Sequence, residues 1–260
     1  MIPIHPQTDA GRRLRTPSEE VAAEDRPTSQ ARPWVYTNMI ASADGATALD
    51  GSSGALGGPA DVEMLVAFRG IADVILVGSA TVTQEGYRPP QPPPEIAAAR
   101  AARGQQERPL IAVVTGRASL GLDLPLFTDP GYRPLVITSQ AAPADRVAEL
   151  ATVADVYITP TPDKPSSVDL TTALGELSRR GHQLILSEGG PTLNAGLVTN
   201  DLIDEWNLTI SPMLVGGNAK RAAQGSEPLT AARPMNLTRV WLTDDGLMFC
   251  RWVRPSRRGV

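Results

Sequence analysis

The hydrophobic pattern of this chain alternates between short apolar runs and segments with helical spacing. Runs of strand length lie at 34–41, 73–78, 110–114, 134–138, 155–158 and 184–187. Helical segments lie between several of them, at 59–70, 144–150, 169–180 and 191–198. Strands that alternate with helices favour a mostly parallel sheet covered by helices on both faces. The pattern therefore predicts an α/β protein.

The end of the chain shows a different pattern. A strand is predicted over 204–213, and two more near Val240 and Met248. Asp244-Asp-Gly246 between the last two is a hairpin-turn signal. We therefore expect antiparallel strands at one edge of the sheet.

Two helices have predicted core faces. In the helix that Pro59 opens, Val62, Leu65 and Val66 are expected to face the core. In the helix over 169–180, that face is formed by Leu170, Leu174 and Leu177.

The chain is predicted to have one folded domain. Residues 1–31 are polar and are expected to form a flexible arm, or an arm that packs on a partner subunit. Residues 32–260 form the domain, and 88–108, rich in Pro, Ala and Arg, are expected to be a surface insertion.

Composition excludes several classes of protein. The net charge is −4 and no basic block stands out, so no nucleic-acid partner is expected. No apolar run approaches the roughly 18 residues of a membrane span. Cys250 is the single cysteine, so no internal disulfide is possible, which fits a cytoplasmic location. It is expected to be a packed apolar residue. With His5 and His182 far apart, no metal site is supported.

The most informative stretch is Leu184-Ile-Leu-Ser-Glu-Gly-Gly-Pro-Thr-Leu193. It predicts a buried strand, an acid at its carboxyl end, a glycine turn and a helix that begins at Pro191. Free N–H groups at a helix start can hold an anion, and open α/β sheets bind ligands at such strand ends. Glu188 is therefore a candidate site residue beside a phosphate-binding turn.

Three other features have a functional and a structural interpretation. Asp44 follows the first strand and is either a site acid or a turn aspartate. Gly78-Ser-Ala-Thr81 either holds a phosphate or ribose or caps a helix. Arg69 shares a helix face with Asp61 and Leu65, and it can bind an anion in a cleft or stabilise the helix end.

Together these residues resemble the reductase domain of bacterial riboflavin biosynthesis, which has the dihydrofolate-reductase fold. The resemblance rests on ordered motifs that cover nearly all of residues 32–254. They are Arg32-Pro-Trp-Val, Ala41-Ser-Ala-Asp-Gly45, Phe68-Arg69, Ala72-Asp-Val-Ile-Leu-Val-Gly78 with Thr81, Ser187-Glu-Gly-Gly-Pro-Thr192, Leu202-Ile-Asp-Glu205 and Ser211-Pro-Met-Leu-Val-Gly216.

The resemblance implies a three-layer fold and an NADPH-dependent reduction of 5-amino-6-ribosylamino-pyrimidine 5′-phosphate to its ribitylamino product. It implies a homodimer. Many relatives carry a fused N-terminal deaminase domain, and none is expected here because residues 1–31 are too short for one. It places Asp44 and Glu188 as the catalytic acids, and Ser53, Arg69 and Glu188 on the substrate, with Arg69 on the phosphate. Carried over in the same way, NADPH is held by Met39, Ala41, Asp61, Val77, Gly78, Ser79, Thr81, Glu85, Gly189, Gly190, Pro191 and Thr192.

The chain also departs from the family pattern. Ala55 and Gly57 stand where a tryptophan and a hydroxyl residue are usual, and Glu85 stands where an aspartate is usual. In the implied reaction a hydride reaches C1′ of the ring-opened imine, and a carboxylic acid or water protonates the nitrogen. Two alternatives stay open: a reductase of a folate- or pterin-like substrate, and a dinucleotide-binding module without activity.

Overall fold

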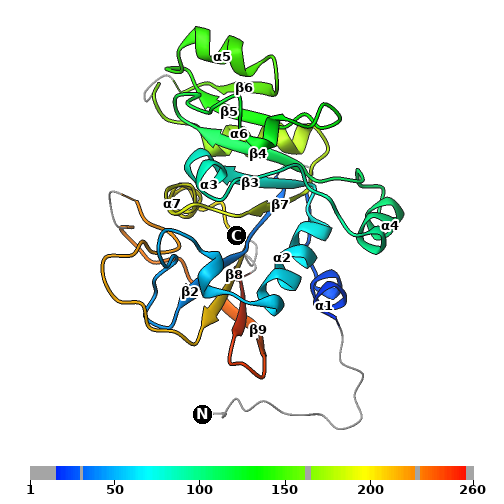
Figure 1. Cartoon of the computed structure of the whole chain (residues 1–260), viewed down its shortest axis with the longest axis vertical. Coiled ribbons are helices and arrows are strands. Elements are labelled where there is room, and N and C mark those ends of the chain that lie inside the picture. The colour runs from blue at the N-terminus through cyan, green and yellow to red at the C-terminus, as the bar shows by residue number, and fades with distance from the viewer. Residues whose placement is uncertain (1–15, 30–31, 162–164, 226–228, 256–260) are drawn as a thin grey trace, which may run out of the picture.

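A ten-stranded sheet is the centre of the molecule, in the order β6-β5-β4-β3-β7-β1-β8-β10-β9, with β2 pairing with β8. The computed structural model describes residues 16–29, 32–161, 165–225 and 229–255 (Figure 1). The strands are β1 Trp34–Thr37, β2 Met39–Ser42, β3 Val74–Gly78, β4 Leu110–Thr115, β5 Leu135–Ser139, β6 Asp155–Thr159, β7 Leu184–Ser187, β8 Glu205–Ser211, β9 Asn236–Leu242 and β10 Met248–Val253.

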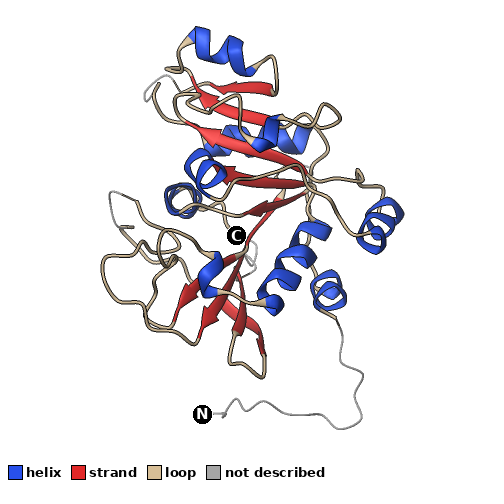
Figure 2. Cartoon of the chain, viewed as in Figure 1, coloured by secondary structure: helices blue, strands red, loops and turns tan. Residues whose placement is uncertain are grey.

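The sheet is mostly parallel, as predicted. All neighbouring pairs from β6 to β8 are parallel, and β10 runs antiparallel to both β8 and β9. Helices cover both faces, which gives three layers (Figure 2). The helices are α1 Pro17–Ala23, α2 Pro59–Ile71, α3 Ser79–Gln84, α4 Pro94–Ala102, α5 Ala144–Leu150, α6 Leu170–Arg179 and α7 Pro191–Thr199.

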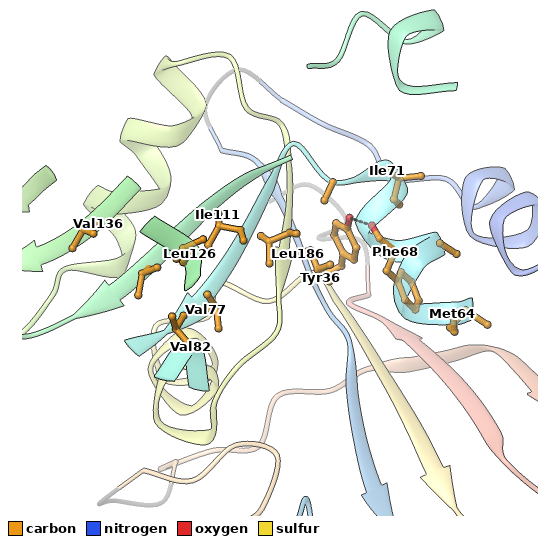
Figure 3. Packing of buried hydrophobic residues seen from close by; sticks show 14 of the residues in the cluster. Tyr36, Met64, Phe68, Ile71, Val77, Val82, Ile111, Leu126, Val136 and Leu186 are labelled. Atoms are coloured by element: carbon orange, nitrogen blue, oxygen red, sulfur yellow. Dashed lines mark hydrogen bonds between the residues drawn. The ribbon is translucent and has the colours of Figure 1, made fainter. Parts of the chain in front are cut away.

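Alternate residues of the buried strands enter two separate cores. Ile75 and Val77 of β3 belong to a cluster with α2, α3 and α5, and Val74 and Leu76 belong to a second cluster with α6 and α7. Tyr36 lies in the first cluster and donates a hydrogen bond of 2.9 Å from its hydroxyl to the Phe68 carbonyl (Figure 3). A strand buried on both faces explains the continuous apolar runs of the sequence.

The core face predicted for α2 is wrong, whereas that of α6 is confirmed. Val62 is 58% exposed, and Met64, Ala67, Phe68 and Ile71 pack into the core instead. The observed core face is therefore rotated about the helix axis relative to the predicted one. The face that carries Asp61, Leu65 and Arg69 lines a cavity. In α6, the predicted Leu170, Leu174 and Leu177 are all buried.

The strand predicted over 34–41 is divided at Asn38, and this division shapes the sheet. β1 pairs with β7 on one side and meets β8 at Tyr36 and Glu205 on the other. Beyond Asn38, β2 pairs with β8 alone, from Met39–Leu208 to Ser42–Ser211. The sheet therefore opens between β7 and β2, beside the carboxyl ends of β3 and β7.

The described part of the expected N-terminal arm, 16–29, is packed against the domain. Thr16 and Glu19 form a capping box at the start of α1, and Val21 is 1% exposed. The Arg26 guanidinium pairs at 2.8 Å with Glu205, which is itself fully buried. Residues 1–15 and 30–31 of the arm lie outside the described residues.

The expected surface insertion at 88–108 is in part buried, which corrects the prediction. Helix α4 lies against the C-terminal end of α2, where Gly70 leaves room for Ile96: a Cβ on Gly70 would lie 3.1 Å from its side chain. Arg100 is fully buried, and its Nη1 donates to the carbonyls of Arg69, Gly70 and Ala72. A cation at this end is favoured because the last carbonyls of a helix carry partial negative charge.

None of the helices in the described ranges is long and apolar enough to cross a membrane. The same residues contain no group of three His, Cys, Asp or Glu side chains that could hold a metal ion. Cys250 is 5% exposed in β10, which confirms that it is a packed apolar residue.

Candidate active site

Two glycine turns meet at the carboxyl ends of β3 and β7. The Gly78 amide donates a hydrogen bond of 2.7 Å to the Gly189 carbonyl, and the Gly189–Gly190 peptide bond is cis. A Cβ on Gly190 would lie 2.7 Å from the Thr81 hydroxyl oxygen, so only glycine fits there without displacing Thr81. The backbone turns thus lie close enough together to form one surface.

Beside these turns, in the opening between β7 and β2, lies a cavity of about 420 Å³, called here the Arg69 cavity. Its walls come from β2, the loop after it, α2, α3 with the following loop, and the residue after β7. Residues predicted for the site that line it are Met39, Ser53, Asp61, Arg69, Thr81, Glu85 and Glu188. The cavity thus joins residues that the sequence spreads over five segments.

Glu188 is held by an arginine and a tyrosine. Arg69 donates from Nε to Oε1 and from Nη2 to Oε2, both at 2.6 Å, and the Tyr87 hydroxyl also donates to Oε2. The Glu188 side chain is 5% exposed and that of Arg69 32%. This is a bidentate, charge-assisted pair, which is stronger and more directional than a single contact.

The pKa values of Arg69 and Tyr87 are both raised in this arrangement. Burial alone would lower the pKa of Arg69, but the charge of Glu188 and its hydrogen bonds raise it overall. Burial, and then the charge of Glu188, raise the pKa of Tyr87 well above its ordinary value. Tyr87 therefore keeps its proton and donates a hydrogen bond to Glu188. The Arg69 guanidinium lies 5.5 Å from the centre of the tyrosine ring.

Asp61 lies on the same cavity wall, and its side chain accepts one hydrogen bond from the residues that the structure describes. The Thr209 hydroxyl of β8 donates to its Oδ1 at 2.8 Å. Burial raises the pKa of Asp61, and the bond from Thr209 opposes this shift. A carboxyl with a raised pKa in a cavity is a common property of functional acids.

Asp44 does not reach this cavity. It is exposed and lines a second cavity of about 490 Å³ with Ala41, Trp206 and Arg221. Its carboxylate accepts hydrogen bonds from the Ser42 hydroxyl and from the amides of Val215 and Gly216. These bonds, that of Ser42 first, lower the pKa of Asp44. The structure therefore separates the two predicted catalytic acids and gives Asp44 the contacts of a turn residue.

The remaining predicted cofactor residues lie at strand ends and helix starts. Gly78 and Gly190 are the N-cap residues of α3 and α7, and neither helix start is capped by a side chain. Uncapped N–H groups of this kind suit the phosphates of a dinucleotide. Val77 is fully buried in β3 and Ala41 lines the second cavity, so neither side chain is in the Arg69 cavity.

Sequence reasoning missed the residues after α3. Tyr87, Arg88, Pro89, Pro90 and Gln91 line the cavity, although most of them belong to the segment expected as a surface insertion. A lone tyrosine before an arginine and two prolines carries no recognisable signal of its own. Only the fold shows that Tyr87 contacts Glu188, which is 101 positions further along the chain.

A mostly parallel three-layer fold with a polar cavity beside glycine turns at its strand ends defines an α/β protein that binds a small ligand. The chain belongs to the family described as the RibD C-terminal domain, whose model matches residues 33–249.

Two archaeal relatives are both named 2,5-diamino-6-ribosylamino-4(3H)-pyrimidinone 5′-phosphate reductase. The protein of Methanothermobacter thermautotrophicus is 30% identical over 221 residues, which is 84% of this chain and 96% of that protein. The protein of Archaeoglobus fulgidus is 30% identical over 187 residues, 72% of this chain and 83% of its own length.

A solved structure agrees with these relatives. A pyrimidine reductase-like protein of Corynebacterium diphtheriae superimposes with a TM-score of 0.81 and 27% identity, covering 92% of this chain and 98% of that one. The resemblance stated from the sequence is confirmed, and so is the prediction of an enzyme, an oxidoreductase of this family. These relatives favour the pyrimidine reductase over the folate-reducing alternative.

Proposed function

We propose that this protein is an NADPH-dependent reductase of riboflavin biosynthesis that reduces a ribosylaminopyrimidine 5′-phosphate to the ribitylamino product in the cytoplasm, as a homodimer. The observation that supports this most is the Arg69 cavity, where polar groups from several segments converge beside two uncapped helix starts. The names of the family relatives supply the substrate class.

The residues fit such a cofactor and substrate. NADPH would lie along Gly78, Thr81 and Gly190 with its phosphates at the starts of α3 and α7, and beside Met39, Asp61 and Glu85. When bound, its nicotinamide supplies the hydride that reduces C1′ of the ring-opened imine. Ser53 and the Arg69–Glu188–Tyr87 trio would orient the substrate, because Glu188 is fixed by its partners and presents a rigid polar surface.

The anionic end of the substrate needs a cation that is not already committed. Two donors of Arg69 are already hydrogen-bonded to Glu188, and the pair has no net charge. Arg88 is exposed on the same cavity wall, and no hydrogen bond or ion pair of its guanidinium occurs within the described ranges. We therefore assign the 5′-phosphate to Arg88, with the remaining donors of Arg69 beside it.

Replacing Arg88 by glutamine is expected to raise the KM for the phosphorylated substrate about tenfold, equal to about 1.4 kcal/mol, with little change in kcat. The loss of a phosphate contact weakens binding but leaves the reacting groups in place. Steady-state kinetics with the phosphorylated and dephosphorylated substrates measure the difference. An equal rise in KM for both would argue against a phosphate contact.

The proposed function is tested by the absorbance of reduced nicotinamide. Purified protein should oxidise NADPH with a ribosylaminopyrimidine 5′-phosphate, supplied both with and without the 2-amino group that the relatives' names specify, and not with dihydrofolate. Oxidation with dihydrofolate alone would favour the alternative, and binding of NADPH without oxidation by any of them would favour a module without activity. Sedimentation analysis tests the proposed homodimer.

A further inference from the structure

We propose that Asp61 is the general acid that protonates the substrate nitrogen as C1′ is reduced, and this inference rests on the proposed function. In that reaction the hydride forms the new C–H bond at C1′, and the π electrons of the C=N bond move to nitrogen. A proton must reach that nitrogen, which leaves the acid as a carboxylate that solvent then reprotonates.

Each of the other carboxyls near the glycine turns lacks a property that the general acid needs. Both oxygens of Glu188 accept hydrogen bonds from Arg69 and Tyr87. Glu85 is exposed and accepts at 3.3 Å from the amide and the hydroxyl of Ser53. Asp44 lies in the other cavity and accepts from Ser42 and two backbone amides. An acid in this role needs a free oxygen, a place in the Arg69 cavity and burial. None of these three residues has all of these properties.

Asp61 has all three. Its Oδ1 accepts from Thr209, whereas no hydrogen bond of Oδ2 occurs among the described residues. It lines the Arg69 cavity, and its burial favours the protonated form that an acid requires. The charged and titratable groups that line this cavity with it are Arg69 on its own helix, Glu85, Tyr87 and Arg88 from α3 and the loop beyond, and Glu188 after β7. Met39 of β2 and Thr209 of β8, which also lie beside this cavity or contact Asp61, are uncharged.

The backbone leaves space for this carboxyl. A Cβ on Gly57 would lie 2.8 Å from Asp61 Oδ2 and 3.2 Å from its Cγ. Gly57 is also the position where the family resemblance expects a hydroxyl residue. Because Gly57 has no side chain, Oδ2 of Asp61 can lie close to the backbone at this position.

The charge of the cavity supports an acid that gains a proton when ligands bind. With every group ionised, Asp61, Glu85 and Glu188 outnumber Arg69 and Arg88. A dinucleotide and a phosphorylated substrate both add negative charge. Adding like charge near a carboxylate disfavours its ionised form, so binding favours protonated Asp61.

Replacing Asp61 by asparagine tests the proposal, since the amide keeps the size of the side chain and still accepts from Thr209. We expect kcat to fall by about 10²–10⁴-fold, while NADPH affinity, measured by direct binding, changes by less than about threefold. Asp145→Asn, an exposed aspartate at the start of α5, is the matched control with unchanged kcat.

The pH profile separates an acid from a structural residue. Wild-type kcat should fall as pH rises through the raised pKa of Asp61, because the carboxylate has no proton to give. Thr209→Val removes the hydrogen bond that lowers this pKa, so the alkaline limb should move to higher pH. In Asp61→Asn the limb should disappear.

The pH dependence of folding stability tests the pKa of Asp61 without any turnover. The pKa of Asp61 is higher in the folded state than in an unfolded chain, where it is about 3.9. The folded state then binds more protons between these two values, so this group makes stability fall as pH rises. The stability of Asp61→Asn relative to wild type should therefore grow with pH in denaturant titrations, and that of Asp145→Asn should not.

The outcomes distinguish the two proposals. Wild-type protein that reduces none of the pyrimidines would overturn the proposed function. Active wild type together with an Asp61→Asn variant within threefold of its kcat would overturn the role of Asp61 alone. An alkaline limb that Thr209→Val leaves in place would do the same, even if Asp61→Asn failed to fold.

Discussion

Replacing Arg69 by methionine is expected to destabilise the fold by about 2 kcal/mol and to lower kcat/KM by at least about a hundredfold. The Glu188 side chain, 5% exposed, would lose two of its hydrogen bonds and keep a charge without a partner cation. Breaking a buried pair costs about 3–5 kcal/mol, but the Arg69 side chain is 32% exposed, so water offsets part of this. The loss of activity follows because Glu188 would no longer be held in position.

The double variant Arg69→Met with Glu188→Gln separates these two effects. It removes the unpaired charge, so stability should recover towards wild type while activity stays low. Denaturant titration and steady-state kinetics on all four proteins complete the cycle. Additive stability changes, or a fully active Arg69→Met variant, would contradict the pair as the organiser of the cavity.

Replacing Arg100 by methionine is expected to cost about 3 kcal/mol or more of folding stability. This guanidinium is fully buried and donates to the carbonyls of Arg69, Gly70 and Ala72 at the end of α2, and to those of Gln106 and Glu107. Methionine fills much of the space but donates no hydrogen bond, so the buried Ala72 carbonyl loses its contact with the guanidinium. The midpoint of urea unfolding should fall with an unchanged slope.

Arg103→Met is the matched control for Arg100→Met. Arg103 follows the same helix and also donates to the Gly70 carbonyl, at 2.7 Å, but it is exposed. Water can replace its contact, so we expect a change of less than about 1 kcal/mol. Equal effects of the two variants would show that burial of Arg100 does not determine its contribution.

The strand and helix order could be predicted because the sheet is buried on both faces. Runs such as 73–78 and 184–187 are continuous in the sequence for this reason, and Pro59 and Pro191 mark helix starts that the structure keeps. The core face of α2 could not be predicted. Its apolar residues occupy more than one face, and only the position of the cavity shows that the Asp61–Arg69 face is turned away from the core.

The candidate site was predicted in part for a similar reason. Residues at the carboxyl ends of parallel strands meet at one edge of the sheet. The sequence therefore predicts that Glu188 and the Gly78 turn lie close together. The bond between Arg69 and Glu188 joins positions 119 apart, and no local pattern records it. The division of the first strand at Asn38 gave no signal either, although it opens the sheet where the cavity lies.

The measurement that tests the central claim most directly is a single turnover with NADPH that carries deuterium on the transferred position of the nicotinamide. With a ribosylaminopyrimidine 5′-phosphate, mass spectrometry should find one deuterium at C1′ of a ribitylamino product, and a much slower reaction in Arg69→Met. A reduced product without deuterium at C1′, or deuterium transferred to dihydrofolate but to neither form of the pyrimidine, would contradict the account.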